Sequence, residues 1–157
     1  MTSTKILSLD EAQKRVAEWK NEGNEVVFTN GCFDIVHLGH VDYLEKASQL
    51  GQKMVVALNT DKSVSQLKGP ERPINNEYAR ARIIASLGFV DAVILFGEET
   101  PLSAIEALIP DILVKGNDYT IDKIVGADFV LEHGGKVETI PLVEGYSTTN
   151  LVSKLKK

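Results

Sequence analysis

The sequence has a single cysteine among its 157 residues, Cys32, so it can form no internal disulfide, which is typical of a reducing compartment. No apolar run is long enough to span a membrane, and Met1 to Lys5 lead into no signal-peptide-like stretch. Acidic residues outnumber basic ones by 22 to 17. Nucleic-acid affinity depends on phosphate neutralisation, so this balance argues against it. We expect a cytoplasmic protein that binds neither membrane nor nucleic acid.

Motifs of several common enzyme classes are also missing. There is no Gly-x-x-x-x-Gly-Lys-Ser/Thr loop, which argues against a P-loop kinase. No Gly-x-Gly-x-x-Gly follows the first expected strand, which argues against a dinucleotide redox enzyme, and no Gly-x-Ser-x-Gly elbow is present. His37 and His40 have no convincing third ligand, so we expect no metal site made by the protein.

What the sequence does contain is a regular alternation of strand and helix patterns. The apolar run Met54 to Leu58 is typical of a strand buried on both faces of a parallel sheet. Ser8 and Glu11 form the pattern of a capping box at the start of a helix. We expect an α/β fold, a Rossmann-like three-layer sandwich with a mainly parallel five-stranded sheet. The expected strands are 25–29, 53–59, 92–96, 112–114 and 136–140; the expected helices are 9–21, 41–50, 76–87, 101–108, 121–132 and 148–155, with a polar loop over 60–73.

The segment from Thr29 to His40 carries the strongest functional signal. It joins the first expected strand to a helix, and His37 and His40 flank Gly39 where that helix opens. A helix N-terminus offers unpaired N–H groups and a partial positive charge, to which histidines add donors. This turn therefore suits a bound phosphate. Taken alone, the histidines could instead cap the helix or bind a metal.

Polar segments follow four of the five expected strands. They comprise residues 29–40, 59–72, 115–119 and 147–149. Ligands of open parallel sheets bind beyond the carboxyl ends of the strands. We therefore expect these segments to converge on one site.

The same segments, taken in order, resemble the HxGH nucleotidyltransferase superfamily, the cytidylyltransferase-like proteins. The likeness runs from about Glu25 to the C-terminus and is greatest to the adenylyltransferases of D-glycero-β-D-manno-heptose 1-phosphate, one half of a bifunctional heptose-phosphate enzyme. The matching blocks are Phe33-Asp34, His37-Leu38-Gly39-His40, Ala57 to Asp61, Leu67-Lys68-Gly69, Arg72-Pro73, Arg80, Val114 to Tyr119 and Glu144 to Asn150.

The resemblance implies an enzyme that moves AMP from ATP to a sugar 1-phosphate and releases pyrophosphate, with ADP-heptose as the product in that branch. It implies Mg²⁺ carried by the ATP, and a homodimer. Residues 25–157 would form the nucleotidyltransferase domain, and residues 1–24 an N-terminal helix packed on it. The attacking phosphate has a second pKa of about 6 and needs no general base, so the protein must align two polyanions and offset their charge.

Site residues follow from the resemblance position by position. The expected catalytic residues are His37, His40, Lys68 and Arg80. Nucleotide and acceptor are expected to contact Thr29, Asn30, Gly31, Phe33, Asp34, Gly39, Arg72, Lys115, Gly116, Asp118, Ser147, Thr148 and Thr149. Several of these have simpler interpretations: Asp34 could cap a turn, Arg80 could pair with Glu77, and Ser147 could cap a helix.

The match departs from the family at two positions. Ser48 stands where many members have Lys or Arg, and Asn117 stands where this branch often has glycine. Leu142 occupies the position of an arginine in the glycerol-phosphate cytidylyltransferases, which argues against that branch. Three alternatives stay open: a CTP-dependent polyol-phosphate cytidylyltransferase, a non-catalytic nucleotide-binding module, and a metal site on His37 and His40.

Overall fold

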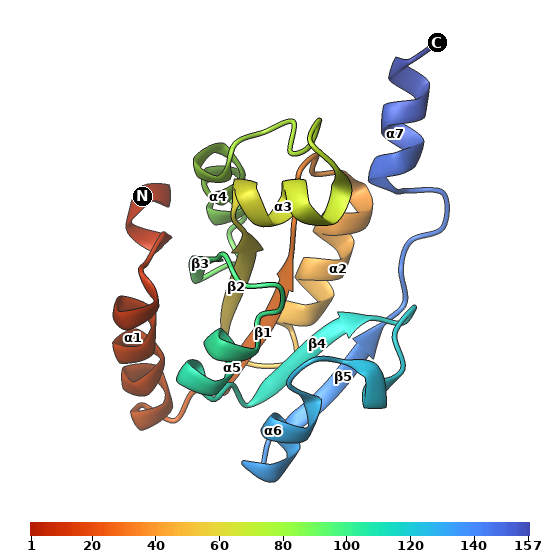
Figure 1. Ribbon diagram of the computed structural model, residues 1–157. Helices are drawn as coiled ribbons and strands as arrows, with labels where there is room; N and C mark the ends of the chain where they lie inside the picture. The colour runs from red at the N-terminus through yellow and green to blue at the C-terminus, as the bar shows by residue number, and fades with distance from the viewer.

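One sheet of five strands organises the protein, which is described over residues 1–157 by a computed structural model (Figure 1). The strand order is β3-β2-β1-β4-β5, and all four neighbouring pairs are parallel. The strands are β1 (Val26–Gly31), β2 (Lys53–Asn59), β3 (Ala92–Phe96), β4 (Ile112–Gly116) and β5 (Lys136–Ile140). The α/β fold expected from the sequence is confirmed.

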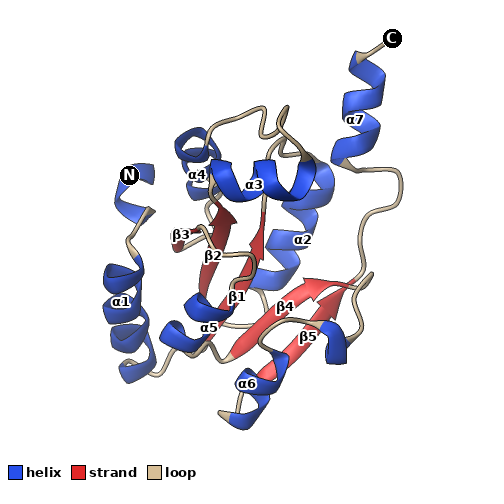
Figure 2. Cartoon of the chain, in the orientation of Figure 1, coloured by secondary structure: helices blue, strands red, loops and turns tan.

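Helices cover both faces of the sheet (Figure 2). Successive strand residues point to opposite faces, so Phe28 packs with α1, α5 and α6, whereas Val27 packs with α2 and α4. The result is the expected three-layer sandwich. The α-helices are α1 (Leu9–Asn21), α2 (Leu38–Ser48), α3 (Asp61–Lys68), α4 (Glu77–Ala85), α5 (Leu102–Leu108), α6 (Ala127–Glu132) and α7 (Thr148–Leu155); the 3₁₀ helices are η1 (Thr2–Lys5) and η2 (Ile121–Lys123).

The N-terminal helix α1 shares the core of the sheet. Ser8 Oγ accepts a hydrogen bond from the Glu11 N–H, and the Glu11 carboxylate accepts one from the Ser8 N–H, as the capping box predicts. One face of α1 buries Ala12, Val16 and Trp19 in the same cluster as strand residues of β1 to β3. The N-terminal segment thus packs on the sheet that carries the site.

Two stretches differ from the sequence expectation. Residues 60–73, expected as a loop, contain α3, which Thr60 caps by accepting from the Ser63 N–H. This helix buries little besides Val64, so its apolar period was too weak to detect. The helix expected over 121–132 is divided into η2 and α6, because Gly126 lies at φ +87° between them.

The C-terminal helix α7 projects from the body of the molecule (Figure 1). None of its residues is buried. It follows a segment that leaves β5 and passes the carboxyl ends of the strands (Figure 1). No helix of the chain combines the length and the apolar character needed to cross a membrane.

Candidate active site

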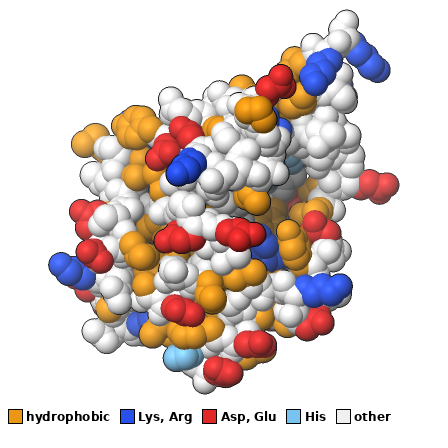
Figure 3. Space-filling view, in the orientation of Figure 1, with side chains coloured by type: hydrophobic (Ala, Val, Ile, Leu, Met, Phe, Trp, Pro, Cys, Tyr) orange, Lys and Arg blue, Asp and Glu red, His pale blue; other side chains and the backbone are white.

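A cavity of about 300 Å³ lies at the carboxyl ends of β1 and β4. Its walls come from the end of β1, the N-terminus of α2, the end of α3, the end of β4 and the segment before α7. Figure 3 shows a hollow here, with a histidine at its back and charged side chains along its edge. The predicted residues on its wall are Asn30, Gly31, Phe33, Asp34, His37, Gly39, His40, Lys68, Lys115, Gly116, Asp118, Ser147 and Thr148.

The two histidines of the HxGH motif form a stacked pair at the start of α2. Their ring centroids are 3.8 Å apart with planes 23° apart. The His37 backbone N–H donates to His40 Nδ1 at 3.4 Å, so a neutral His40 ring carries its proton on Nε2. Burial, together with the charges of His37 and Lys68, lowers the pKa of His40 to about 4, and a hydrogen bond to the Ile35 backbone carbonyl opposes this shift. His40 is therefore a neutral hydrogen-bond donor at pH 7.

His37 lines the cavity and has a ring nitrogen without a partner. Its Nδ1 is buried and has no hydrogen-bond partner within the chain, and burial lowers its pKa as well. Gly39 permits this arrangement, because a Cβ at that position would lie 2.9 Å from His37 Cε1. A side chain there would displace the ring, so the glycine of the motif is a steric requirement.

The turn after β1 supports His40 through Phe33. The Phe33 backbone has φ +47°, a region that costs a non-glycine residue free energy and is often found at functional sites. Its ring meets the edge of the His40 ring at 5.0 Å between centroids. A Cβ on Gly31 would lie 2.8 Å from Phe33 Cε2. Gly31 and Phe33 thus act together to fix the His40 ring.

Asp34 ties the segment after α3 to the cavity wall. Its carboxylate accepts hydrogen bonds from Arg72 Nε at 2.7 Å and from the Ile74 and Asn75 N–H groups at 2.8 Å. Burial raises the pKa of Asp34, but these hydrogen bonds outweigh it and hold the pKa below its usual range. Arg72, expected to contact substrate, does not line the cavity because Asp34 holds its guanidinium; its Nη2 is buried and unpartnered.

Arg80 requires a larger correction, because it does not reach the cavity at all. It is fully buried, and it donates to the carbonyl oxygens of Cys32 (2.9 Å), Asn59 (2.8 Å) and Asn75 (3.0 Å), and to Asp61 Oδ1 (2.9 Å). Its guanidinium therefore joins the chain after β1, the end of β2 and the start of α3. This placement fits a positioning role rather than a phosphate contact.

Thr29 and Thr149 also lie off the cavity. Thr29 is fully buried, and its hydroxyl bonds to Tyr43 Oη at 2.8 Å and to the Val114 carbonyl at 2.9 Å. Tyr43 Oη lies 3.0 Å from the same carbonyl oxygen, and two hydroxyl protons serve these three contacts, so the group joins β1, α2 and β4. Thr149 is exposed in the first turn of α7, beyond the cavity wall. Neither threonine can contact a ligand in the cavity without movement.

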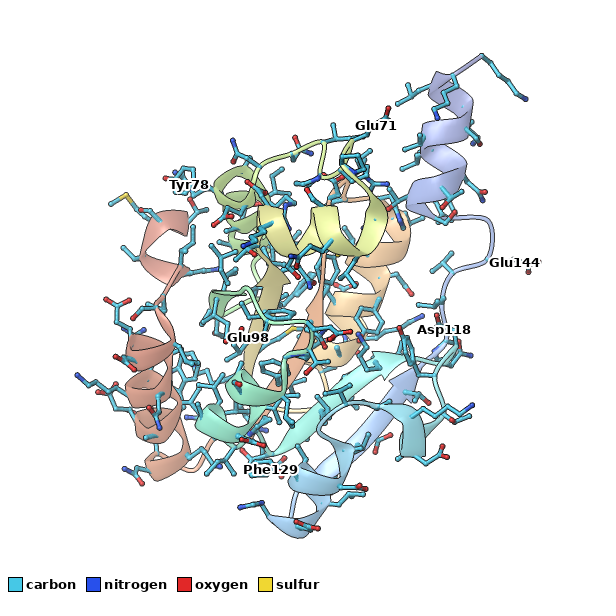
Figure 4. The ribbon with its side chains drawn as sticks, viewed as in Figure 1. Glu71, Tyr78, Glu98, Asp118, Phe129 and Glu144 are labelled. Atoms are coloured by element: carbon cyan, nitrogen blue, oxygen red, sulfur yellow. The ribbon has the colours of Figure 1, made fainter.

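Lys115 provides a half-buried cation at the end of β4. Its Nζ lies 3.3 Å from the Asn30 carbonyl oxygen, 3.4 Å from Asn30 Oδ1 and 5.2 Å from the centre of the Tyr119 ring. Burial lowers its pKa, and the nearby Asp118 and Cys32 oppose that shift. Figure 4 shows Asp118 on the loop that follows β4. A phosphate here would add a second anionic partner to the ammonium group.

The opposite wall is open. Lys68, at the end of α3, is exposed and makes no hydrogen bond or ion pair within the chain. Ser147 caps α7 by accepting from the Asn150 N–H at 3.0 Å. Ser147 and Thr148 therefore bring the N-terminus of a helix to the cavity, where it favours an anion.

Sequence reasoning missed six residues of the wall. Tyr119 and Tyr146 lie inside blocks that matched the family, so their positions were available as a signal. Tyr43 was assigned to the apolar stripe of a helix, which conceals its hydroxyl. The full set is Cys32, Tyr43, Tyr119, Leu142, Val143 and Tyr146. Ser48, which stands where many family members have Lys or Arg, donates to the Glu45 carbonyl. The neighbouring Lys46 pairs with Asp42 on the surface, so Lys46 does not replace the missing basic residue.

A neutral stacked histidine pair at the first strand–helix turn of a parallel sheet defines a nucleotidyltransferase-type site. The chain belongs to the cytidylyltransferase-like family, whose sequence pattern matches residues 28–152. It is 57% identical over 147 residues to the bifunctional protein HldE of Gluconobacter oxydans (strain 621H), covering 94% of this chain and 31% of that protein. It is 54% identical to the HldE of Magnetococcus marinus over 98% of this chain.

The chain spans about a third of the length of these relatives. It is also similar to a solved structure, the lipopolysaccharide core biosynthesis protein from Thermoplasma volcanium GSS1. That similarity has a TM-score of 0.62 and 31% identity, and it covers 80% of this chain and all of the other. The family resemblance noted in the sequence is thereby confirmed.

Proposed function

We propose that the chain transfers AMP from ATP to D-glycero-β-D-manno-heptose 1-phosphate, giving ADP-heptose and pyrophosphate. The observation that carries the proposal is the cavity at the strand ends, where the neutral pair His37 and His40 faces two lysines, Lys68 and Lys115. The high identity to the HldE proteins supports the choice of acceptor.

The proposed chemistry is one in-line displacement. An oxygen of the acceptor phosphate forms a bond to the α-phosphorus of ATP, and the bond from that phosphorus to the bridging oxygen breaks. The electron pair leaves with pyrophosphate. Because the attacking phosphate is largely dianionic at neutral pH, no side chain has to remove a proton. The protein contributes alignment and charge stabilisation.

The geometry supports distinct roles for the cavity groups. His40 Nε2–H and the N-terminal N–H groups of α2 are donors for the transferred phosphate and its leaving group. Lys68, exposed and unpaired, suits the flexible outer phosphates. Lys115 suits the acceptor phosphate, because its ammonium group lines the cavity beside Asn30 at the end of β1. Arg80 and Arg72 are proposed as positioning residues.

Mg²⁺ would accompany the triphosphate. The chain has no group of three side chains able to hold a metal, and the Asp34 carboxylate is already occupied by three donors. With so few side-chain ligands available, the site fits an ion that is bound mainly by phosphate oxygens and water, as Mg²⁺ commonly is. Its chemistry there is to neutralise charge between the phosphates.

A homodimer is part of the proposal, on the strength of the family resemblance. The exposed helix α7 supports it, since a second copy could cover its exposed apolar side chain Leu155. Light scattering coupled to size exclusion tests this. A mass near twice the 17.2 kDa of one chain is expected, and a mass of 17.2 kDa at micromolar concentration would contradict it.

The function is tested by incubating the protein with ATP, Mg²⁺ and heptose 1-phosphate and identifying the product by mass spectrometry. ADP-heptose together with one pyrophosphate per product is expected. Tight ATP binding without any pyrophosphate would instead favour a non-catalytic nucleotide-binding module.

A further inference from the structure

A second chamber adjoins the main cavity, and the proposed reaction leaves it without a role. Its volume is about 140 Å³, and it lies between the loop that follows β3 and the segment around η2. In Figure 1 that loop passes in front of β2 and β1. Asn30, Lys115 and Tyr119 line both spaces, so the two are neighbours across a shared wall. The remaining lining residues are Glu99, Thr100, Pro101, Lys123, Ile124 and Val125.

The volume of the main cavity leaves a role for a neighbouring subsite. At about 300 Å³, it lies at the lower end of the range for pockets that hold a single drug-sized ligand. The proposed reaction requires a nucleoside triphosphate and a sugar phosphate at the same time. The chamber behind Lys115 is the adjoining space, and any phosphate held by Lys115 would be within reach of both.

The chemistry of the chamber suits a molecule with a phosphate at one end and hydroxyl groups at the other. Lys115 lies at the shared wall, whereas Glu99 lies on the β3 side and Lys123 on the η2 side. Glu99 makes no hydrogen bond or ion pair within the chain, so its carboxylate is free to accept. A carboxylate accepts hydrogen bonds only, and an ammonium donates them only, so together they match hydroxyl groups, which do both.

We propose that Glu99 is the residue that selects the acceptor, by accepting hydrogen bonds from the hydroxyl groups of a sugar whose phosphate lies at Lys115. The inference rests on the proposed function and adds a specificity residue to it. Position explains the orientation: Lys115 lies at the wall shared with the nucleotide cavity, so a phosphate bound to it lies on the side of that cavity, whereas Glu99 lines the second chamber alone. The acceptor therefore enters with its phosphate toward the α-phosphorus.

The larger groove beside η2 does not serve the same purpose. Its lining runs from Tyr119 to Asp122 and on to α6 and Thr139 of β5. It contains neither histidine nor Lys115, so an acceptor bound there has no cation at which to place its phosphate. The second chamber is thus the better candidate despite its smaller volume.

Glu99→Gln tests the proposal, with Glu98→Gln as the matched control. Glu98 lies on the same loop, carries the same charge and lines neither chamber (Figure 4). For Glu99→Gln we expect the KM for heptose 1-phosphate to rise about tenfold or more, the usual effect of losing a charge-assisted hydrogen bond. The KM for ATP and the kcat at saturation should stay within about twofold, since no contact to ATP is lost.

The ratio of kcat/KM values for two acceptors distinguishes a loss of acceptor selectivity from general structural damage. The preference for heptose 1-phosphate over glycerol 3-phosphate, as a ratio of kcat/KM values, should fall in Glu99→Gln and stay constant in Glu98→Gln. An unchanged ratio in Glu99→Gln, or an equal fall in both variants, would overturn the role of Glu99.

A binding measurement tests the role of Glu99 without requiring turnover. Calorimetric titration of heptose 1-phosphate into wild type and Glu99→Gln, each saturated with a non-hydrolysable ATP analogue, should show about tenfold weaker binding in the variant. If wild type binds the sugar phosphate through Glu99 without turnover, the adenylyltransferase proposal fails and the assignment of Glu99 stands. If wild type does not bind it, both fail.

Discussion

The two walls of the main cavity are built in opposite ways. The wall made by the end of β1 and its neighbours is supported from behind by buried hydrogen bonds: Thr29 is tied to β4, Asp34 to the loop after α3, and Arg80 to three backbone carbonyls. The wall made by Lys68 and the segment before α7 is exposed and has few contacts. The histidine pair lies between them.

This difference suggests a division of labour. The rigid wall holds the donors His37 and His40 where charge develops in the proposed reaction, so little reorganisation is required at that moment. The open wall can move, which lets a bulky triphosphate enter and pyrophosphate leave. Substitutions in the rigid wall should therefore change turnover or stability, whereas substitutions in the open wall should change substrate affinity.

The largest effect is expected at His40. In the proposed reaction His40→Ala should lower kcat roughly 100- to 1,000-fold, as is typical for loss of one donor to a transition state, with little change in the KM for ATP. Steady-state pyrophosphate release measures both. The control is His133→Ala, because His133 is exposed, packs at a tilt against Phe129 and lies outside the cavity. If the loss of kcat/KM in His40→Ala came entirely from a higher KM, His40 would bind the ground state and would not act on the transition state.

Arg80 should have the next largest effect, and it should act on stability. Arg80→Ala leaves the Cys32 and Asn59 carbonyls without a donor in the protein interior, which should lower the free energy of unfolding by about 3 kcal/mol. Urea denaturation measures this. Arg82→Ala, on the exposed face of the same helix, should change it by less than about 0.5 kcal/mol. Equal values for the two variants would show that Arg80 does not hold the rigid wall together.

Lys68 should show the behaviour of the open wall. Lys68→Ala should raise the KM for ATP about tenfold and leave stability unchanged, because the side chain has no partner in the chain. Lys62→Ala is the control, since Lys62 is exposed on the same helix and does not line the cavity. A loss of stability in Lys68→Ala, or an unchanged KM, would remove the distinction between the two walls.

The last prediction concerns the pH dependence of stability. The pKa of His40 in the folded protein is about 4, below the ordinary 6.5, so between these values the unfolded chain binds a proton that the folded protein does not. The free energy of unfolding should therefore be greatest above pH 6.5 and fall as pH drops toward 4. In His40→Asn, urea titrations across this range should show a shallower fall. A slope identical to that of wild type would mean that His40 is not held neutral by the fold.

Much of the fold could be predicted because its signals are local. The run Met54 to Leu58 identifies a buried strand by itself, and Ser8 with Glu11 identifies a helix start. The helix α3 could not be predicted, since it is short and polar and is stabilised by the Thr60 cap and by packing of Val64. The break at Gly126 was missed because a glycine inside an apolar pattern does not reveal its φ angle.

The sequence predicted which motifs gather at the site, but it did not predict which of their side chains face the cavity and which lie behind it. Motif positions brought His37, His40 and Lys115 to one cavity, because the carboxyl ends of parallel strands converge. Whether an arginine faces the cavity or lies behind it depends on tertiary partners that no motif encodes. Arg80 shows this most clearly, since its three carbonyl partners come from residues between 5 and 48 positions away in the sequence.

The most direct test of the central proposal is pyrophosphate release in Mg²⁺ with ATP or CTP, each paired with heptose 1-phosphate or glycerol 3-phosphate. We expect turnover with ATP and the heptose phosphate alone, because Leu142 lines the cavity where the glycerol-phosphate branch has an arginine. Turnover confined to CTP and glycerol 3-phosphate, or no turnover in any of the four reactions, would contradict the proposed adenylyltransferase.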